Sequence, residues 1–132
     1  MPDQSLFLIS RVVDDYDRAK VFYCDDLGFT CIEDTPLGEG KRWVVVKPKG
    51  SNGAALLLAE AADERQRAAI GNQTGGRVGF FLKTDDFARD HAAMLARGVR
   101  FAEEPRHEAY GIVAVFADPY GNTWDLIEHT TR

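Results

Sequence analysis

The strongest constraint on the fold is an order of strand-like and helix-like segments that occurs twice along the chain. In the first half, an apolar segment precedes a helix that Asp15 can cap and Gly28 can end. In the second half, Asp86 and Gly98 stand in the same places around another predicted helix. A half of about sixty residues buries little surface by itself, so the two halves are expected to fold as one structure.

Each half is predicted to form a βαβββ module within a single domain of residues 1–132, which makes the fold α+β. Module one spans residues 1–60, a linker spans 61–76, and module two spans 77–132. Strands are expected at residues 6–13, 29–33, 42–46, 54–59, 77–83, 99–101, 111–117 and 123–129. Helices are expected after Asp15, after Asp86 and over 60–70, and loops or turns at 36–40, 48–53 and 118–122. Phe87, His91, Met94 and Leu95 share one face of the second helix, so we expect that face to be buried.

Charge and apolar content exclude two classes of partner. The 132 residues include 16 basic and 21 acidic side chains, a formal charge of −5, which disfavours nucleic acid. The longest uncharged apolar runs, such as residues 54–59, are far shorter than the ~20 residues of a membrane span. No secretory leader precedes Ser5, and Cys24 and Cys31 lack metal-site spacing, so we expect reduced thiols and a cytoplasmic location.

The two ends of the chain carry a family resemblance. Val13-Asp14-Asp15-Tyr16, followed by Phe22-Tyr23 and Leu27-Gly28-Phe29, resembles the opening of glyoxalase and bleomycin-resistance proteins. The segment Phe116-Ala117-Asp118-Pro119-Tyr120-Gly121-Asn122-Thr123-Trp124-Asp125-Leu126 resembles their last hairpin. The resemblance to this vicinal oxygen chelate superfamily implies two modules whose curved mixed sheets enclose a cleft, usually in a homodimer. In family enzymes it also implies a divalent metal in that cleft.

The metal ligands implied by the resemblance are largely missing. The family places a histidine or glutamate early in each module, which here falls among residues 7–10 and 77–80, and a glutamate late in each module. The late position of module one falls among residues 55–58, which read Ala-Leu-Leu-Leu, and only Asp125 in module two is acidic. One carboxylate does not satisfy a divalent metal. We therefore expect no resident metal or other cofactor.

Other chemistries have weaker support. A non-standard metal site could draw on His107, Asp125, Glu128 and His129 of module two, which keeps a divalent metal ion as the alternative. The sequence contains no GxSxG motif and no nucleophile beside an obvious base. The glycine-rich segment 71–76 lacks the lysine of a phosphate-binding loop.

Polar residues inside apolar strands are candidates for ligand binding. Arg11 interrupts the first strand and Arg77 opens the fifth, and either could pair with Asp125 to form a polar anchor at the family's metal position. The same pair could equally be a structural salt bridge.

Aromatic and loop residues complete the candidate set. Trp43 and Arg42 lie on opposite faces of the third strand, so only one of them faces a cleft. The polar segment 103–111 is expected to be a loop at the cleft mouth, and it contributes His107 and Tyr110 as candidate ligand contacts.

Three functions are consistent with these residues. The first is a metal-independent protein that binds a small organic ligand in a cleft. The second is a lactoylglutathione-lyase-like lyase or isomerase that uses a non-standard divalent metal site. The third is a protein whose dimer surface is its function. We expect a homodimer, because helices cover only one face of each predicted sheet.

Overall fold

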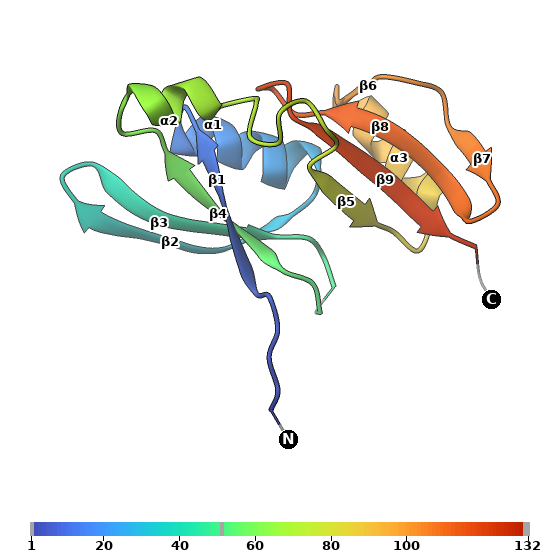
Figure 1. Cartoon of the computed structure of the whole chain (residues 1–132). Coiled ribbons are helices and arrows are strands. Elements are labelled where there is room, and N and C mark those ends of the chain that lie inside the picture. Colours follow the sequence, from blue (N-terminus) through green and yellow to red (C-terminus); the bar gives the residue numbers. More distant parts are fainter. Residues whose placement is uncertain (1, 51, 131–132) are drawn as a thin grey trace. The chain divides into compact units, whose positions relative to one another are not determined.

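The computed structural model describes residues 2–50 and 52–130, which form two compact units, one through Ile70 and one from Gly71 onward. Each unit is a mixed β-sheet with a helix on one face (Figure 1). The α+β class is as predicted, and so is the order of elements, except that the second unit has an additional short strand, β7, in the segment expected to be a loop. Among the described residues, no helix is long and apolar enough to cross a membrane.

The first unit contains a four-stranded sheet in the order β1-β4-β3-β2, with β1 parallel to β4 and the other pairs antiparallel. Its elements are β1 (Leu8–Val13), α1 (Tyr16–Lys20), the π-helix η1 (Val21–Asp26), β2 (Thr30–Gly38), β3 (Lys41–Lys47), β4 (Ala55–Glu60) and α2 (Glu64–Ala69).

One face of this sheet packs against α1. Arg42 of β3 reaches Asp17 of α1, and its guanidinium lies 5.0 Å from the centre of the Tyr16 ring. Because side chains alternate along a strand, Val44 and Val46 point the same way as Arg42, and both are fully buried. Trp43 therefore lies on the opposite face, as the alternation predicts.

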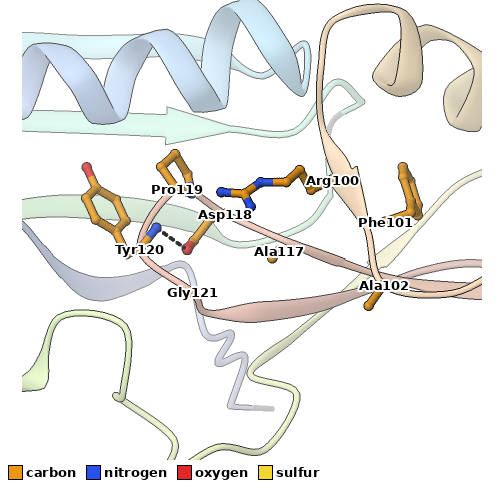
Figure 2. Close-up of a pocket in the computed structure, with 8 residues that line it drawn as sticks. All are labelled: Arg100, Phe101, Ala102, Ala117, Asp118, Pro119, Tyr120 and Gly121. Atoms are coloured by element: carbon orange, nitrogen blue, oxygen red, sulfur yellow. Dashed lines mark hydrogen bonds between the residues drawn. The ribbon is translucent and has the colours of Figure 1, made fainter.

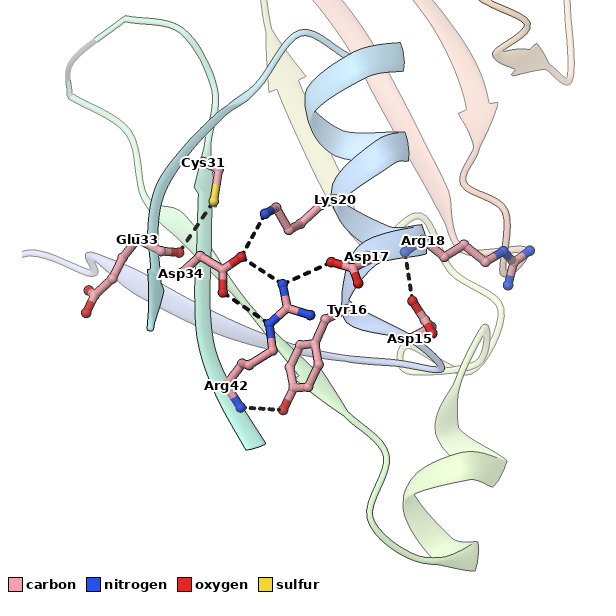
Figure 3. A network of polar contacts seen from close by, with 9 residues as sticks. All are labelled: Asp15, Tyr16, Asp17, Arg18, Lys20, Cys31, Glu33, Asp34 and Arg42. Carbon is pink, nitrogen blue, oxygen red and sulfur yellow. Dashed lines mark hydrogen bonds and ion pairs between the residues drawn. The ribbon is translucent and has the colours of Figure 1, made fainter. Parts of the chain in front are cut away.

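A network of charges holds α1 to the hairpin of β2 and β3 (Figure 3). Asp34 accepts hydrogen bonds from Arg42 Nη2 and from Lys20 Nζ, both at 2.7 Å. These contacts with Arg42 and Lys20 hold the pKa of Asp34 well below its usual range. The three side chains are only about a quarter exposed, which favours a structural role over a binding role.

The second unit contains a sheet in the order β5-β9-β8-β6, with β7 also paired to β8. Its elements are β5 (Phe80–Lys83), α3 (Phe87–Ala96), β6 (Arg100–Phe101), β7 (Arg106–Glu108), β8 (Gly111–Ala117) and β9 (Thr123–His129).

Aromatic rings fill the space between this sheet and α3. Trp124 is buried, with its ring centroid 4.4 Å from Phe80 and 5.6 Å from Phe116. His91 of α3 packs between Phe87 and Phe101 as an edge-of-core ring. Leu95 was expected on the same buried face, but it is 49% exposed, because the buried stripe follows Phe87 and Met94 instead.

The structure corrects several predicted boundaries. Residues 36–38 are not loop, because β2 continues to Gly38 and reverses through Glu39 and Gly40, both with positive φ. Pro36 is compatible with this because β2 is an edge strand, where a missing N–H leaves no ladder bond unmade. The fifth strand begins at Phe80 rather than at residue 77, and α2, the helix expected over 60–70, spans Glu64–Ala69 only.

The first helix also differs from the expected regular α-helix. Its second half is a π-helix, which ends with a hydrogen bond of 3.0 Å from Leu27 N to Phe22 O. Gly28 follows with a φ of +83°, as predicted. The wider turn buries the adjacent rings of Phe22 and Tyr23 together.

Candidate functional site

The first and last strands of each unit run side by side and place one residue pair in the same position. In the first unit Ser10 of β1 is the partner of Leu57 of β4. In the second unit Phe81 of β5 is the partner of Asp125 of β9. Ser10 and Phe81 each stand five residues before the aspartate that caps the following helix, so the two pairs are equivalent.

Both pairs lie on the face of the sheet that carries no helix. In the second unit, Phe87 N donates to Glu128 Oε1, so Glu128 points toward α3 and Asp125 points away from it. In the first unit, Leu57 alternates with Leu56 and Leu58 and is paired with Val45, on the face opposite Val44. We call these two surfaces the helix-free faces.

On the helix-free face of the second unit, the residues beside Asp125 on the two neighbouring strands are apolar. Asp125 stands between Phe81 on β5 and Val115 on β8, and Ile127 follows it on the same face. Phe81 is 67% exposed. Asp125 Oδ1 is buried and has no hydrogen-bond partner among the described residues.

Burial raises the pKa of Asp125, because loss of water disfavours its charged form. The charge of Arg106 acts in the opposite direction, and Glu103 adds a smaller upward effect. Arg106 and Glu103 are bonded to each other, with Nε to Oε1 at 3.0 Å. Both ion pairs of Arg106 are with Glu103 and Glu108. Within the described part of the chain, Asp125 therefore forms no ion pair.

The residues at the family's ligand positions do not fit a divalent metal. The strand register gives Ser10, Leu57, Phe81 and Asp125, of which one is a carboxylate and two are hydrocarbon side chains. The sequence predicted the early ligand position of the second module among residues 77–80. The strand register places that position one residue later, at Phe81. Divalent metals need several charged or imidazole ligands, which this set does not supply.

The alternative donor set is divided between two faces. His107 is paired with Ile112, which is paired with Glu128, so these residues share the face toward α3. Asp125 and His129 lie on the opposite face. Over residues 2–50 and 52–130, no group of three or more His, Cys, Asp or Glu side chains is placed to hold a metal ion. The described residues therefore do not assemble the alternative, non-standard site.

The two candidate arginines differ in position. Arg11 is buried in β1 and shares the α1-facing side with its partner Leu58. Arg77 is exposed and precedes β5, three residues before the partner of Trp124. In the described part of the chain no ion pair joins Arg77 to Asp125, and the cation whose charge lowers the pKa of Asp125 is Arg106.

The remaining candidates lie at edges and turns. Trp43 is 37% exposed on the helix-free face of the first unit. His107 is exposed on β7, a strand inside the segment that was expected to be a loop. Tyr110 is half exposed where the chain turns from β7 to β8, and its carbonyl accepts from Thr130 N at 2.7 Å.

Each unit also has an open surface depression. The one in Figure 2, of about 470 Å³, lies where β6 approaches the turn between β8 and β9. Asp118 in this depression is occupied by the turn itself, since Oδ1 accepts from Tyr120 N and Asn122 N. The other, of about 540 Å³, lies beside Ile32 and Lys47 in the first unit. Neither includes a sequence-predicted site residue.

Nucleophilic chemistry has no support from the cysteines. Cys24 and Cys31 are free and partly buried. Burial raises the pKa of the Cys24 thiol, which lowers its thiolate fraction.

Sequence reasoning missed Phe81, Glu103 and Arg106. The signal for Phe81 was the adjacent pair Phe80 and Phe81, because alternation allows only one of them to face the helix.

Comparisons with known proteins agree with this architecture. The model of the glyoxalase/bleomycin resistance protein/dioxygenase superfamily matches residues 6–126. An uncharacterized protein of Shewanella frigidimarina is 54% identical over 126 residues, which cover 95% of this chain and 93% of that protein. The crystal structure of UcmS2 is 28% identical, with a TM-score of 0.82 over 96% of this chain and 98% of that chain. The structure of TnmS3, an antibiotic binding protein from Streptomyces sp. CB03234, is 32% identical, with a TM-score of 0.77 over 98% and 99%. The fold and the sequence together show that this chain belongs to the glyoxalase/bleomycin resistance protein/dioxygenase superfamily.

Proposed function

We propose that the protein binds a small organic ligand on a helix-free face and does so without a metal ion. The observation that carries the proposal is the chemistry of the residues at the family's ligand positions, which are Ser10 and Leu57 in the first unit and Phe81 and Asp125 in the second, with one carboxylate among them. Such a surface suits a hydrophobic ligand with one polar contact. The likeness to TnmS3, an antibiotic binding protein, supports the same class of function.

Exposed aromatic side chains give the ligand its contact area. Phe81 in the second unit and Trp43 in the first are exposed on the helix-free faces. An exposed large apolar side chain on a sheet face costs solvation free energy that a ligand or partner recovers on binding. We infer a homodimer for the same reason, and a cytoplasmic location is consistent with the two free thiols.

A binding screen with matched variants tests the proposal. The purified protein is analysed for metals and then screened by thermal shift against aromatic antibiotics, with and without a chelator. We expect far less than one metal ion per chain and ligand-induced stabilisation that the chelator leaves unchanged. Phe81→Ser should weaken binding about tenfold, the loss expected for removing one buried aromatic contact.

Leu95→Ser is the control, because Leu95 is also an exposed apolar residue of the second unit but lies on α3. Equal effects of the two substitutions would contradict the proposed surface. About one Zn²⁺, Ni²⁺ or Fe²⁺ per chain, whose removal abolishes ligand binding, would contradict metal independence and favour the lyase or isomerase alternative.

A further inference from the structure

Asp125 has a carboxylate oxygen that receives no hydrogen bond from the described residues, and if the proposed function holds, the bound ligand must supply the donor. Oδ1 is buried and unbonded among the described residues. The side chains on either side, Phe81 and Val115, offer no hydrogen-bond donor. A buried acceptor left unpaired is costly, and because Asp125 as a residue is only partly buried, a ligand that donates to its carboxylate offsets part of that cost.

Arg106, the cation whose charge acts on Asp125, is already bonded to other acids. Arg106 donates from Nε to Glu103 and from Nη1 to Glu108, at 3.0 and 2.7 Å. Glu103 also accepts from Val115 N at 2.9 Å, which fixes its carboxylate at the edge of the sheet. The Arg106 guanidinium is therefore already paired with two carboxylates other than Asp125.

The local charge is therefore negative. Asp125, Glu103 and Glu108 contribute three carboxylates against Arg106 and the exposed Lys83 of β5. A ligand carboxylate or phosphate on this face would be repelled by Asp125, whereas a cation would be attracted.

Phe81 adds a second feature that suits a cation. Its ring is 67% exposed and belongs to the residue paired with Asp125. The face of an aromatic ring attracts a cation, and the effect adds to the contact with a carboxylate beside it. A hydrocarbon group of the ligand can pack on the same ring.

We propose that the ligand of the second unit's helix-free face carries a protonated amine attached to an aromatic or other apolar body. The amine donates to Asp125 and lies against Phe81, and the apolar body covers Val115 and Ile127. Asp125 therefore acts as a specificity residue that accepts cationic ligands and rejects anionic ones.

Three probes with one ring system test this. They are 2-(aminomethyl)naphthalene, which is protonated at neutral pH, the neutral 2-naphthylmethanol, and the anionic 2-naphthoic acid. Each is titrated at pH 7 into ¹⁵N-labelled full-length protein, and the shifts of the Phe81, Val115 and Asp125 amides give the site and the affinity. We expect the amine to bind about tenfold more tightly than the alcohol, with the acid weakest.

Two variants separate the carboxylate from general charge. Asp125→Asn should remove the preference for the amine and leave the affinity for the alcohol nearly unchanged. Glu104→Gln removes the same charge from an exposed position in the same unit and should preserve the preference. Circular dichroism of both variants checks that they are folded.

The outcomes distinguish this inference from the proposed function. If the alcohol shifts these amides and the amine binds no more tightly, the inference is overturned and the proposed function stands. An amine preference that persists in Asp125→Asn, or shifts confined to other residues, also overturns it. If none of the probes shifts these amides, both the inference and the proposed binding face are rejected.

Discussion

Asp125 links the chemistry of the helix-free face to the stability of the fold. Burial raises the pKa of Asp125 in the folded protein above the ordinary value of about 3.9 that it has when unfolded. Between these two pKa values the folded state holds a proton that the unfolded state has released. The contribution of this carboxyl to stability is therefore most favourable at low pH and declines as pH rises through the folded pKa.

Asp125→Asn removes this dependence. We expect the variant to gain stability relative to the native protein as pH increases from about 3 to 7, because only the native protein pays for charging a buried carboxyl. Urea unfolding of both proteins at a series of pH values measures the difference. A difference in unfolding free energy that stays constant over this range would contradict a raised pKa.

Gly111 is a second residue on which the second unit depends. Its φ is +151°, and a Cβ placed there would lie 2.1 Å from the carbonyl oxygen of Glu128 on β9. Gly111→Ala should therefore force the start of β8 away from β9 and cost about 2 kcal/mol or more. Gly53→Ala is the control, since its Cβ meets no atom within 4 Å, and it should change the unfolding free energy by less than about 0.5 kcal/mol. Chemical denaturation measures both, and equal effects would refute the steric argument.

At the residue scale, Asp125 could be predicted because it is the acidic residue that follows the Asp118–Asn122 turn in a recognisable hairpin. Its neighbours could not be predicted with the same accuracy. Whether Phe80 or Phe81 faces the helix depends on the phase of a four-residue strand, which only the pairing with β9 determines. Arg106 was missed because the short strand β7 has no apolar alternation to reveal it.

At the scale of elements, α3 is fixed at its first turn by two carboxylates. Asp86, the N-cap, accepts from Arg89 N, as the sequence predicts for such an aspartate. Glu128 of β9 accepts from Phe87 N at 2.7 Å, a contact between residues 41 apart in sequence. The second bond satisfies another free N–H of the first turn and ties the helix to the sheet.

Removal of Glu128 should therefore destabilise the second unit. We expect Glu128→Ala to lower the unfolding free energy by about 1 kcal/mol, the usual cost of losing a helix cap. Glu104→Ala removes an equal charge from an exposed residue and should have little effect. Thermal and urea unfolding compare the two variants, and similar losses would show that the Glu128 contact is not a cap.

The elements themselves were largely predictable because their boundaries are local. Asp15, Asp86, Gly28 and Gly98 define helix ends through caps and positive φ, which a sequence displays directly. The π-helical turn at Val21–Asp26 was not predictable, because the apolar spacing of the segment is that of a regular α-helix. The extension of β2 through Pro36 was missed because a sequence does not show that a strand is an edge strand.

At the scale of the whole molecule, the duplicated order of elements and the two terminal motifs were sufficient to predict the family, which the match over residues 6–126 confirms. Ligand specificity is not determined at this scale. Proteins of one fold bind different molecules because a few side chains on a common sheet face differ. In this chain the proposed specificity residues are Phe81, which is exposed, and Asp125, whose Oδ1 is unbonded among the described residues, at positions where the resemblance implied metal ligands.

The last prediction concerns assembly. Helices cover one face of each sheet, and the segment before β1 exposes Leu6 and Phe7, at 74% and 73%. Adjacent apolar side chains this exposed are unfavourable in a monomer, and a second copy of the chain would bury them. We therefore expect a homodimer in sedimentation velocity at micromolar concentration. The double substitution Leu6→Ser and Phe7→Ser should shift the equilibrium toward monomer.

Val21→Ser is the control, because Val21 is also an exposed apolar residue but lies on η1, and it should leave the dimer intact. A monomeric native protein would refute the prediction, and a dimer unaffected by the double substitution would exclude this segment from the interface.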